Sequence, residues 1–240
     1  MITMKNTPQF AGVTFSGTTQ DMEELYDALH HIVGYQELDK GLEPLRLSIL
    51  GFCYELRHAR MGNRSISSEE HGLDPEILKW HSMILPAKNV IVEFNVLWPY
   101  LIQVVYALNE FIDRYLKQHK KKISDWDLHV ASVRLFQSKV LQLAETILSE
   151  RAFSNFKKMI QQTPYQPFRY YPQFIDYLCH EWEKLSREMR AKKLQIFGKR
   201  LFEYSTEYEK FVNDIDGFAA ENDMLPSEVN FVEDDEPIEW

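Results

Sequence analysis

LRLSILGFCYELRHA, at residues 45–59, is the stretch that decides the fold, because a helix of this sequence is apolar on two sides. At 100° per residue, one apolar stripe consists of Leu45, Ile49, Phe52, Cys53 and Leu56. A second stripe, of Leu47, Leu50 and Tyr54, lies roughly opposite. A helix with both stripes is expected to pack on both faces, so we predict that it is the central buried helix of the domain.

The residues that flank this helix are typical of helix ends. Pro44 stands just inside the start, where a missing N–H is tolerated, and Gly62 follows the end. Residues 62–72 are polar and are expected to form a loop.

The rest of the sequence predicts a mainly α (α+β) fold, bundle-like, with a small sheet of short strands. From apolar spacing, and from capping boxes of Thr18 with Asp21 and of Ser124 with Asp127, helices are expected at 18–34, 74–80, 98–117, 124–147, 153–162, 174–189 and 194–217. Strands are expected at 10–17, at 229–232 and within 84–96, the last as a hairpin or as one strand that can pair with 12–16. Prolines 164, 167 and 172 punctuate an aromatic loop that no helix can cross.

The composition indicates one folded domain in a reducing compartment. A chain of 240 residues with 45% hydrophobic content can form one large core, and we assign residues 1–220 to a single mainly helical domain with a small N-terminal α/β portion. Cys53 and Cys179 lie inside apolar helical patterns without a redox spacing. The amino terminus lacks a secretory pattern, and the longest apolar run, 96–108, is too short to span a bilayer. We therefore expect a soluble cytoplasmic protein without a membrane partner.

The net charge of −9 is concentrated at the C-terminus. Residues 221–240 hold eight acidic and no basic side chains, which leaves 28 acidic against 27 basic in the other 220 residues. Such an acidic segment is expected to solvate the terminus or to cover a basic surface of the same molecule. This charge balance disfavours attraction of the whole protein to nucleic acid, although a local basic patch remains an alternative.

Several segments together resemble a known family. They are FAGVTFSG (10–17), ELYDALHHIVG (24–34), RLSILGFCYELRHA (46–59), LKWHSMI (78–84), NVIVEFNVLWP (89–99), RLFQ (134–137) and the closing acidic segment that ends in Trp. They are similar to a family of bacterial proteins of unknown function. The resemblance implies a bacterial cytoplasmic protein, and it brings no activity, cofactor or site residue.

The best candidate site is the polar end of the 45–59 helix. Glu55, Arg57 and His58 crowd its last turns, and His81 follows in a short connection. We favour a structural interpretation, in which cations stabilise the helix end and Glu55 pairs with one of them. The alternatives are a ligand or phosphate site, and acid–base catalysis by His58 or His81.

A metal site is not expected. Asp27 with His30, and Glu55 with His58, give an acid three residues before a histidine on two helices, as in di-metal bundles. Asp27, however, lies on the face away from the apolar stripe of its helix, and the further inward carboxylates that such a site needs are missing. We predict neither a metal nor a cofactor.

Two basic segments form the candidate nucleic-acid surface. Residues 184–200 hold seven basic and one acidic side chain, and 114–122 add five basic residues beside His119. The candidate phosphate contacts are Arg187, Arg190, Lys192, Lys193, Lys199 and Arg200. The competing interpretation is a solvated helix face that the acidic segment partly neutralises.

The linear motifs of common enzymes are missing from the sequence. It has no glycine-rich phosphate loop, HExxH, paired CxxC or GxSxG. We therefore predict a non-enzymatic protein that acts through protein–protein binding. The alternatives are nucleic-acid binding through the basic helices, with the acidic segment as a competitor, and an enzyme centred on Glu55, Arg57, His58 and His81.

Overall fold

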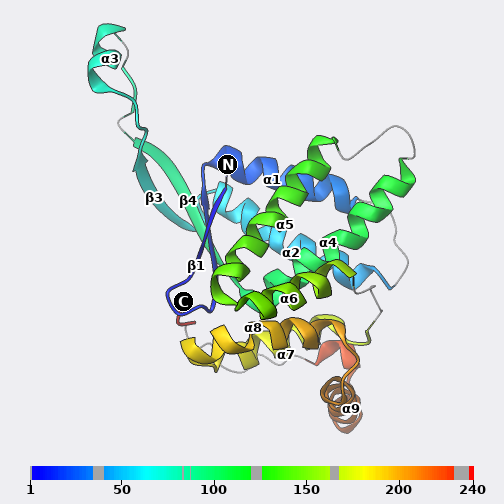
Figure 1. Cartoon of the computed structure of the whole chain (residues 1–240). Helices are drawn as coiled ribbons and strands as arrows, with labels where there is room; N and C mark the ends of the chain where they lie inside the picture. The colour runs from blue at the N-terminus through cyan, green and yellow to red at the C-terminus, as the bar shows by residue number, and fades with distance from the viewer. Residues whose placement is uncertain are drawn as a thin grey trace.

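The computed structural model describes residues 2–34, 41–82, 84–86, 88–119, 126–162, 168–229 and 238–240. Within these ranges the chain is mainly helical, with one small four-stranded antiparallel sheet (Figure 1). The predicted fold class is confirmed.

The elements follow one another along the chain in an α+β order. The strands are β1 (Thr3–Asn6), β2 (Gly12–Gly17), β3 (Ser65–Glu70) and β4 (Lys88–Leu97). The helices are α1 (Thr19–Val33), α2 (Glu43–Arg60), α3 (Pro75–Trp80), α4 (Trp98–Gln118), α5 (Leu128–Ile147), α6 (Glu150–Gln162), α7 (Tyr171–Glu183), α8 (Arg187–Phe202) and α9 (Thr206–Glu221), and a 3-10 turn, η1, spans Pro226–Glu228.

The sheet joins the amino terminus to the middle of the chain. Its strand order is β1-β2-β4-β3, and Phe15 of β2 lies opposite Phe94 of β4. The predicted pairing of residues 12–16 with the strand expected within 84–96 is confirmed. The rings of Phe15 and Phe94 stack at 5.1 Å, and Phe52 of α2 and Phe136 of α5 pack against Phe15. These four rings hold α2 and α5 on the sheet.

The helix enclosed on most sides is α4, not α2. Thirteen of the 21 residues of α4 are buried, so its apolar surface extends nearly around the helix. In α2 the stripe that contains Phe52 and Leu56 is buried, but Leu47 is 54% exposed and Tyr54 is 49% exposed. The prediction that α2 packs on both faces is therefore wrong. Periodicity identifies an apolar face, but it does not say whether another element covers that face.

Capping residues fix several helix ends. The predicted capping box of Thr18 and Asp21 is confirmed at the start of α1, and Gly34 follows its last residue. Asp127 is the N-cap of α5, where its side chain accepts from the backbone N–H groups of residues 129 and 130. The helix expected from residue 124, with Ser124 as its cap and Asp127 in its first turn, therefore begins at Leu128 instead. Ser124 itself lies outside the described residues.

The carboxyl-terminal third contains three helices where two were predicted. The expected helices at 174–189 and 194–217 are replaced by α7, α8 and α9, with breaks at 184–186 and 203–205. Ser186 and Ser205 cap the two new starts, accepting hydrogen bonds from the backbone N–H groups of Met189 and Tyr208. A serine side chain satisfies a free N–H at a helix start, so it stabilises a break that apolar spacing does not reveal.

Residues 65–70 form a strand where a loop was predicted. All six residues of β3 are exposed, so Ser-Ile-Ser-Ser-Glu-Glu lacks the alternation of a half-buried strand. The helix predicted at 74–80 is confirmed as α3, and residues 88–97 form a single strand. Of the predicted strand 229–232, Val229 directly follows η1 outside any strand and the other three residues are not described.

β3, α3 and the outer part of β4 project from the body as an arm, which we define as residues 65–92. Figure 1 shows this ribbon leaving the body at the upper left, with α3 at its tip. β3 pairs with β4 from Ser65 opposite Glu93 to Glu70 opposite Lys88. The arm therefore begins where α2 ends, and it carries its own small helix away from the core.

Candidate functional site

The polar cluster at the end of α2 is largely satisfied by local contacts. Arg64 donates to both carboxylate oxygens of Glu55, at 2.7 Å from Nε and 2.9 Å from Nη2. The guanidinium of Arg57 lies 5.1 Å from the ring centre of Tyr54, and the His58 ring lies 4.1 Å from it. This geometry supports the structural interpretation of Glu55, Arg57 and His58, although the partner of Glu55 is a cation beyond the helix.

The structure does not bring His81 to the other three candidates. His81 caps the end of α3, and its ring lies 4.9 Å from that of Trp80. Figure 1 places α3 at the tip of the arm, away from α2. Acid–base chemistry that needs His58 and His81 together has no support from this arrangement.

Neither a metal site nor a reactive thiol is evident in the described part of the chain. It holds no group of three His, Cys, Asp or Glu side chains that could bind a metal ion. Burial raises the pKa of the Cys53 thiol to about 12, and burial also raises the pKa of Cys179. Both thiols are therefore protonated at neutral pH and are poor nucleophiles.

The three arginines proposed to contact nucleic acid instead bind their own chain. Arg190 is buried and donates to the carbonyl oxygens of Gln9, Trp182 and Glu183 at 2.8–3.3 Å. Arg187 donates to a backbone carbonyl in the β1–β2 loop, and Arg200 donates from Nε to a carboxylate of α9 at 2.7 Å. These side chains hold α8 to its neighbours.

The lysines of the basic surface are less constrained. Lys199 Nζ lies 3.3 Å from a carboxylate oxygen of Glu203. Lys192 is exposed and Lys193 is half-buried. In the second basic segment Arg114 is half-buried, and residues 120–122 lie outside the described ranges. The described part of the surface thus offers fewer available cations than the sequence indicated.

The C-terminal residues lie beside the amino-terminal loop and α8. Figure 1 shows the C-terminus next to the turn between β1 and β2. Arg190 Nη1 lies 3.4 Å from the carbonyl oxygen of Glu239 and 3.1 Å from that of Gln9. The end of the acidic segment therefore contacts α8 through a backbone carbonyl oxygen.

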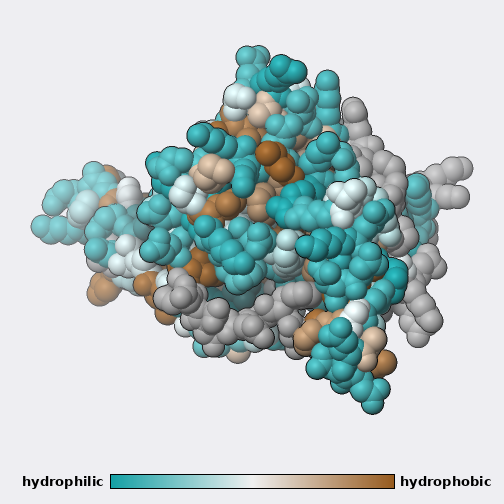
Figure 2. Space-filling model, turned by 90° about the horizontal axis from the view of Figure 1, so that it is seen from below, coloured by the Kyte–Doolittle hydropathy of each residue, from teal (hydrophilic) through white to brown (hydrophobic). Residues whose placement is uncertain are grey.

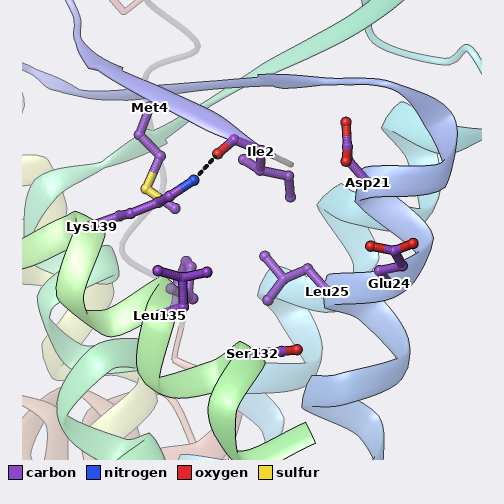
Figure 3. Close-up of a pocket in the computed structure, with 9 residues that line it drawn as sticks. Ile2, Met4, Asp21, Glu24, Leu25, Ser132, Leu135 and Lys139 are labelled. Atoms are coloured by element: carbon purple, nitrogen blue, oxygen red, sulfur yellow. Dashed lines mark hydrogen bonds between the residues drawn. The ribbon is translucent and has the colours of Figure 1, made fainter. Parts of the chain in front are cut away.

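A small cavity lies between β1, α1 and α5 (Figure 3). It measures about 180 Å³, and Ile2, Leu25 and Leu135 give it apolar walls. Lys139 Nζ donates to the carbonyl of Ile2 at 2.5 Å, and Asp21 accepts from the Thr18 backbone N–H. Its lysine and aspartate thus serve the fold, and the cavity has the character of a packing gap.

A second cavity, of about 310 Å³, lies at the ends of α1 and α4 and is lined by three histidines. His31 Nε2 lies 2.8 Å from the hydroxyl oxygen of Tyr115, and the rings of His31 and His129 stack at 4.0 Å. Burial, and then the neighbouring His129, lower the pKa of His31, while Asp127 raises it. The His31 imidazole is therefore favoured in the neutral form.

The arm exposes several large apolar side chains to solvent. Its helix α3 has no buried residue, Trp80 is 78% exposed, and Ile84 is 99% exposed. The other exposed large apolar residues of the arm are Ile66, Leu73, Ile77, Leu85 and Val90. Brown apolar atoms are visible on the arm, at the left of Figure 2. Sequence analysis missed this surface because it assigned the first part of the arm to a loop.

A second apolar surface lies on α2 where the arm begins. We define the α2 stripe as the exposed residues of that helix's outer side, which are Leu47, Gly51, Tyr54, Arg57 and Met61. Their spacing of three and four residues places them along one face. Arg57 is its only charged member. The contact of Arg64 with Glu55 ties the base of the arm to this helix.

Comparisons with known proteins supply a family but no activity. No helix of the described residues combines the length and apolar character that crossing a bilayer requires. No curated protein and no solved structure matches the chain. A family model does match residues 2–240, and by that match the chain belongs to the family described as a domain of unknown function, DUF6904.

Proposed function

We propose that this protein has no catalytic role and acts by binding a protein through its arm. The observation that carries the proposal is that α3 has no buried residue. A helix of six residues is unstable alone in water, because too few hydrogen bonds form to offset its nucleation. Contact with another protein would bury the side chains that this helix exposes.

The chemistry of the arm fits a protein interface. Tryptophan is enriched among residues that dominate binding energies, and Trp80 projects with most of its surface free. Apolar groups surrounded by polar ones are typical of such interfaces. The arm carries four acidic residues, Glu69, Glu70, Asp74 and Glu76, against two lysines, and this excess disfavours an anionic membrane or nucleic acid as its partner.

The alternatives have weaker support. Nucleic-acid binding would use arginines of α8 that already donate to the protein's own oxygens. An enzyme centred on Glu55, Arg57, His58 and His81 would need three residues of α2 to meet a residue at the end of α3, and α3 lies at the tip of the arm (Figure 1). The resemblance of the sequence supports a bacterial, cytoplasmic setting, which we include in the proposal.

A differential pull-down tests the proposal. Tagged wild type is compared with an arm variant, Trp80→Ser with Ile84→Ser, and with a control variant, Trp126→Ser with Leu128→Ser. The control residues are 92% and 74% exposed and lie outside the arm. We expect the same protein from wild type and control, and at least a tenfold lower yield with the arm variant. Equal recovery with all three would contradict the proposal, and nuclease-sensitive recovery would favour nucleic acid.

A further inference from the structure

We infer that the arm binds its partner as an added β-strand, in which a basic, extended segment of another protein pairs antiparallel with the free edge of β3. This inference rests on the proposed function, because it uses the same arm and names the chemistry of the partner. In the added strand, a lysine or arginine lies opposite Glu70 and an apolar β-branched residue lies opposite Ile66.

The register of the sheet determines which backbone groups of β3 point away from it. Successive residues of an antiparallel strand turn their N–H and C=O groups alternately to the two sides. Trp98 donates its N–H to the carbonyl oxygen of Ala11 at 3.1 Å, one position beyond the last paired residues of β2 and β4. Even-numbered residues of β4 therefore bond to β2, and odd-numbered residues of β4 bond to β3.

The even-numbered residues of β3 carry the groups that point outward. Its odd-numbered residues lie opposite odd-numbered residues of β4 and bond to them. We define the free edge as the backbone N–H and C=O groups of the other three residues, Ile66, Ser68 and Glu70. β3 is the outermost strand on its side of the sheet, and no backbone hydrogen bond joins the free edge to a described residue. A row of unpaired groups with this spacing is matched by the backbone of another strand.

The other edge of the sheet is covered by the protein itself. β1 lies against α5, where Asn6 Nδ2 donates to Thr146 Oγ1 at 3.1 Å. Lys139 of α5 also donates to the carbonyl oxygen of Ile2. All six residues of β3 are instead exposed, and Figure 1 shows this strand on the side of the ribbon that faces away from the body. β3 contains no proline or lysine, and its one-to-one register with β4 has no bulge, so these common obstacles to strand addition are missing.

The side chains of β3 select a basic partner. Residues directly opposite each other on neighbouring strands share a face and interact. Ile66 is 61% exposed, so an apolar residue opposite it would remove apolar surface from water. Glu70 lies 3.5 Å from Lys88 Nζ in an exposed pair, which contributes little, so a second cation opposite Glu70 adds attraction. The four acidic and two basic residues of the arm favour the same charge in the partner.

β3 of a second copy does not supply this chemistry. The strand Ser-Ile-Ser-Ser-Glu-Glu contains no basic residue, so no register of β3 against itself places a cation opposite Glu70. When the three outward residues of both copies pair antiparallel, Glu70 lies opposite Ile66. A basic segment of another protein is therefore the better occupant of the free edge.

Hydrogen exchange of single amides, measured by NMR on the isotope-labelled full chain, tests the inference. The probe is the peptide acetyl-Lys-Thr-Thr-Thr-Val-Thr-amide, whose lysine and valine would lie opposite Glu70 and Ile66. In the protein alone, the N–H groups of the free edge should exchange faster than those of the odd-numbered residues of β3. With the peptide at about ten times its dissociation constant, exchange at the free edge should slow about tenfold.

Matched peptides and variants identify the contact. N-methylation of the third peptide residue removes an N–H that faces β3 and should abolish binding, whereas N-methylation of the fourth residue, whose N–H faces away, should not. Glutamate in place of the peptide lysine should weaken binding about tenfold. Ser68→Pro removes an outward N–H that makes no bond to β4, so it should abolish binding without unfolding the strand, whereas Ser68→Ala should bind as wild type does. Circular dichroism melting checks that both variants are folded.

The inference is overturned if the peptide does not bind at up to about 10 mM. Equal binding of the two N-methylated peptides would also overturn it, because the contact would then involve a face of the ribbon and not its edge. Without peptide, exchange at the free edge that slows as the protein concentration rises would assign the edge to a second copy, against the inference.

The pull-down tests the proposed function separately. Recovery that falls with Trp80→Ser and Ile84→Ser, but not with Ser68→Pro, would keep the proposed function and overturn the inference. Recovery that neither variant lowers would reject the proposed function whatever the peptide does, so the two failures are distinguishable.

Discussion

One pair of substitutions on α2 tests how this helix packs. Leu56→Ala and Leu47→Ala are the same chemical change on the same helix, and helix propensity changes equally in both. Leu56 is fully buried, whereas Leu47 is 54% exposed. The difference between their effects therefore measures burial on the two sides of α2.

The expected magnitudes are far apart. A fully buried leucine costs about 2–5 kcal/mol when it is cut to alanine, because transfer energy is lost and a cavity remains. An exposed substitution of this kind lies within about 0.5 kcal/mol of zero. In a chain of this size, at about 2–4 °C per kcal/mol, Leu56→Ala should lower the melting temperature by about 4–20 °C. Leu47→Ala should lower it by no more than about 2 °C.

Urea unfolding at several protein concentrations is the assay. Leu56→Ala should lower the midpoint at every concentration without a change in slope, since it alters stability and not the surface exposed on unfolding. Leu47→Ala should match wild type at every protein concentration, because its side chain is largely exposed. Equal destabilisation by both variants in dilute protein would refute one-sided packing of α2.

Four further predictions address other parts of the fold. Gly12→Ala should destabilise the protein strongly or prevent folding, because its Cβ would lie 2.0 Å from a backbone oxygen of β4. Gly217→Ala places its Cβ where no atom lies within 4 Å, so it should stabilise the protein by about 0.5–1 kcal/mol in thermal melts. Gln103→Met should stabilise by about 1–3 kcal/mol in urea, since this fully buried amide has no hydrogen-bond partner among the described residues. Between pH 7.5 and 5.5, the His31→Gln variant should lose less stability than wild type. The pKa of His31 is lowered in the folded protein, so the unfolded chain binds the proton more readily. Wild type is therefore destabilised as the pH falls through the ordinary pKa of 6.5, and the variant lacks this contribution. A chain that ends at Glu228 should lose about 1–3 kcal/mol of unfolding free energy, because it lacks a buried valine and the backbone contact of the C-terminus with α8. It should gain no salt-dependent affinity for single-stranded DNA in fluorescence anisotropy.

Local signals in the sequence were sufficient for most helices. Thr18 and Asp21 mark the start of α1 through a reciprocal pair of hydrogen bonds. Asp127 is itself the cap of α5, so that helix begins at Leu128 and not at the predicted residue 124. β2 was also predictable, because its β-branched and aromatic residues form a short run between small residues. These features depend on neighbours within a few residues, which a single sequence contains.

Features that depend on distant partners were not predictable. β3 has no apolar alternation and is a strand because β4 pairs with it. The basic residues of α8 indicated a solvated or nucleic-acid surface. Arg190 is instead buried, and it donates to the backbone oxygen of Gln9, which is far from it in the sequence. Among the site candidates, Glu55 pairs with Arg64, which lies beyond the end of α2. His81 follows α3 at the tip of the arm, away from the three candidates on α2.

Photo-cross-linking at the tip of the arm is the most direct test of the central claim, that the arm binds a protein. The chain is expressed in its source cells with p-benzoylphenylalanine in place of Trp80, and a matched variant carries the same group in place of Trp126. The account predicts a protein cross-linked to position 80, which mass spectrometry can identify, and none cross-linked to position 126. No cross-linked protein at position 80, or the same products from both positions, would contradict it.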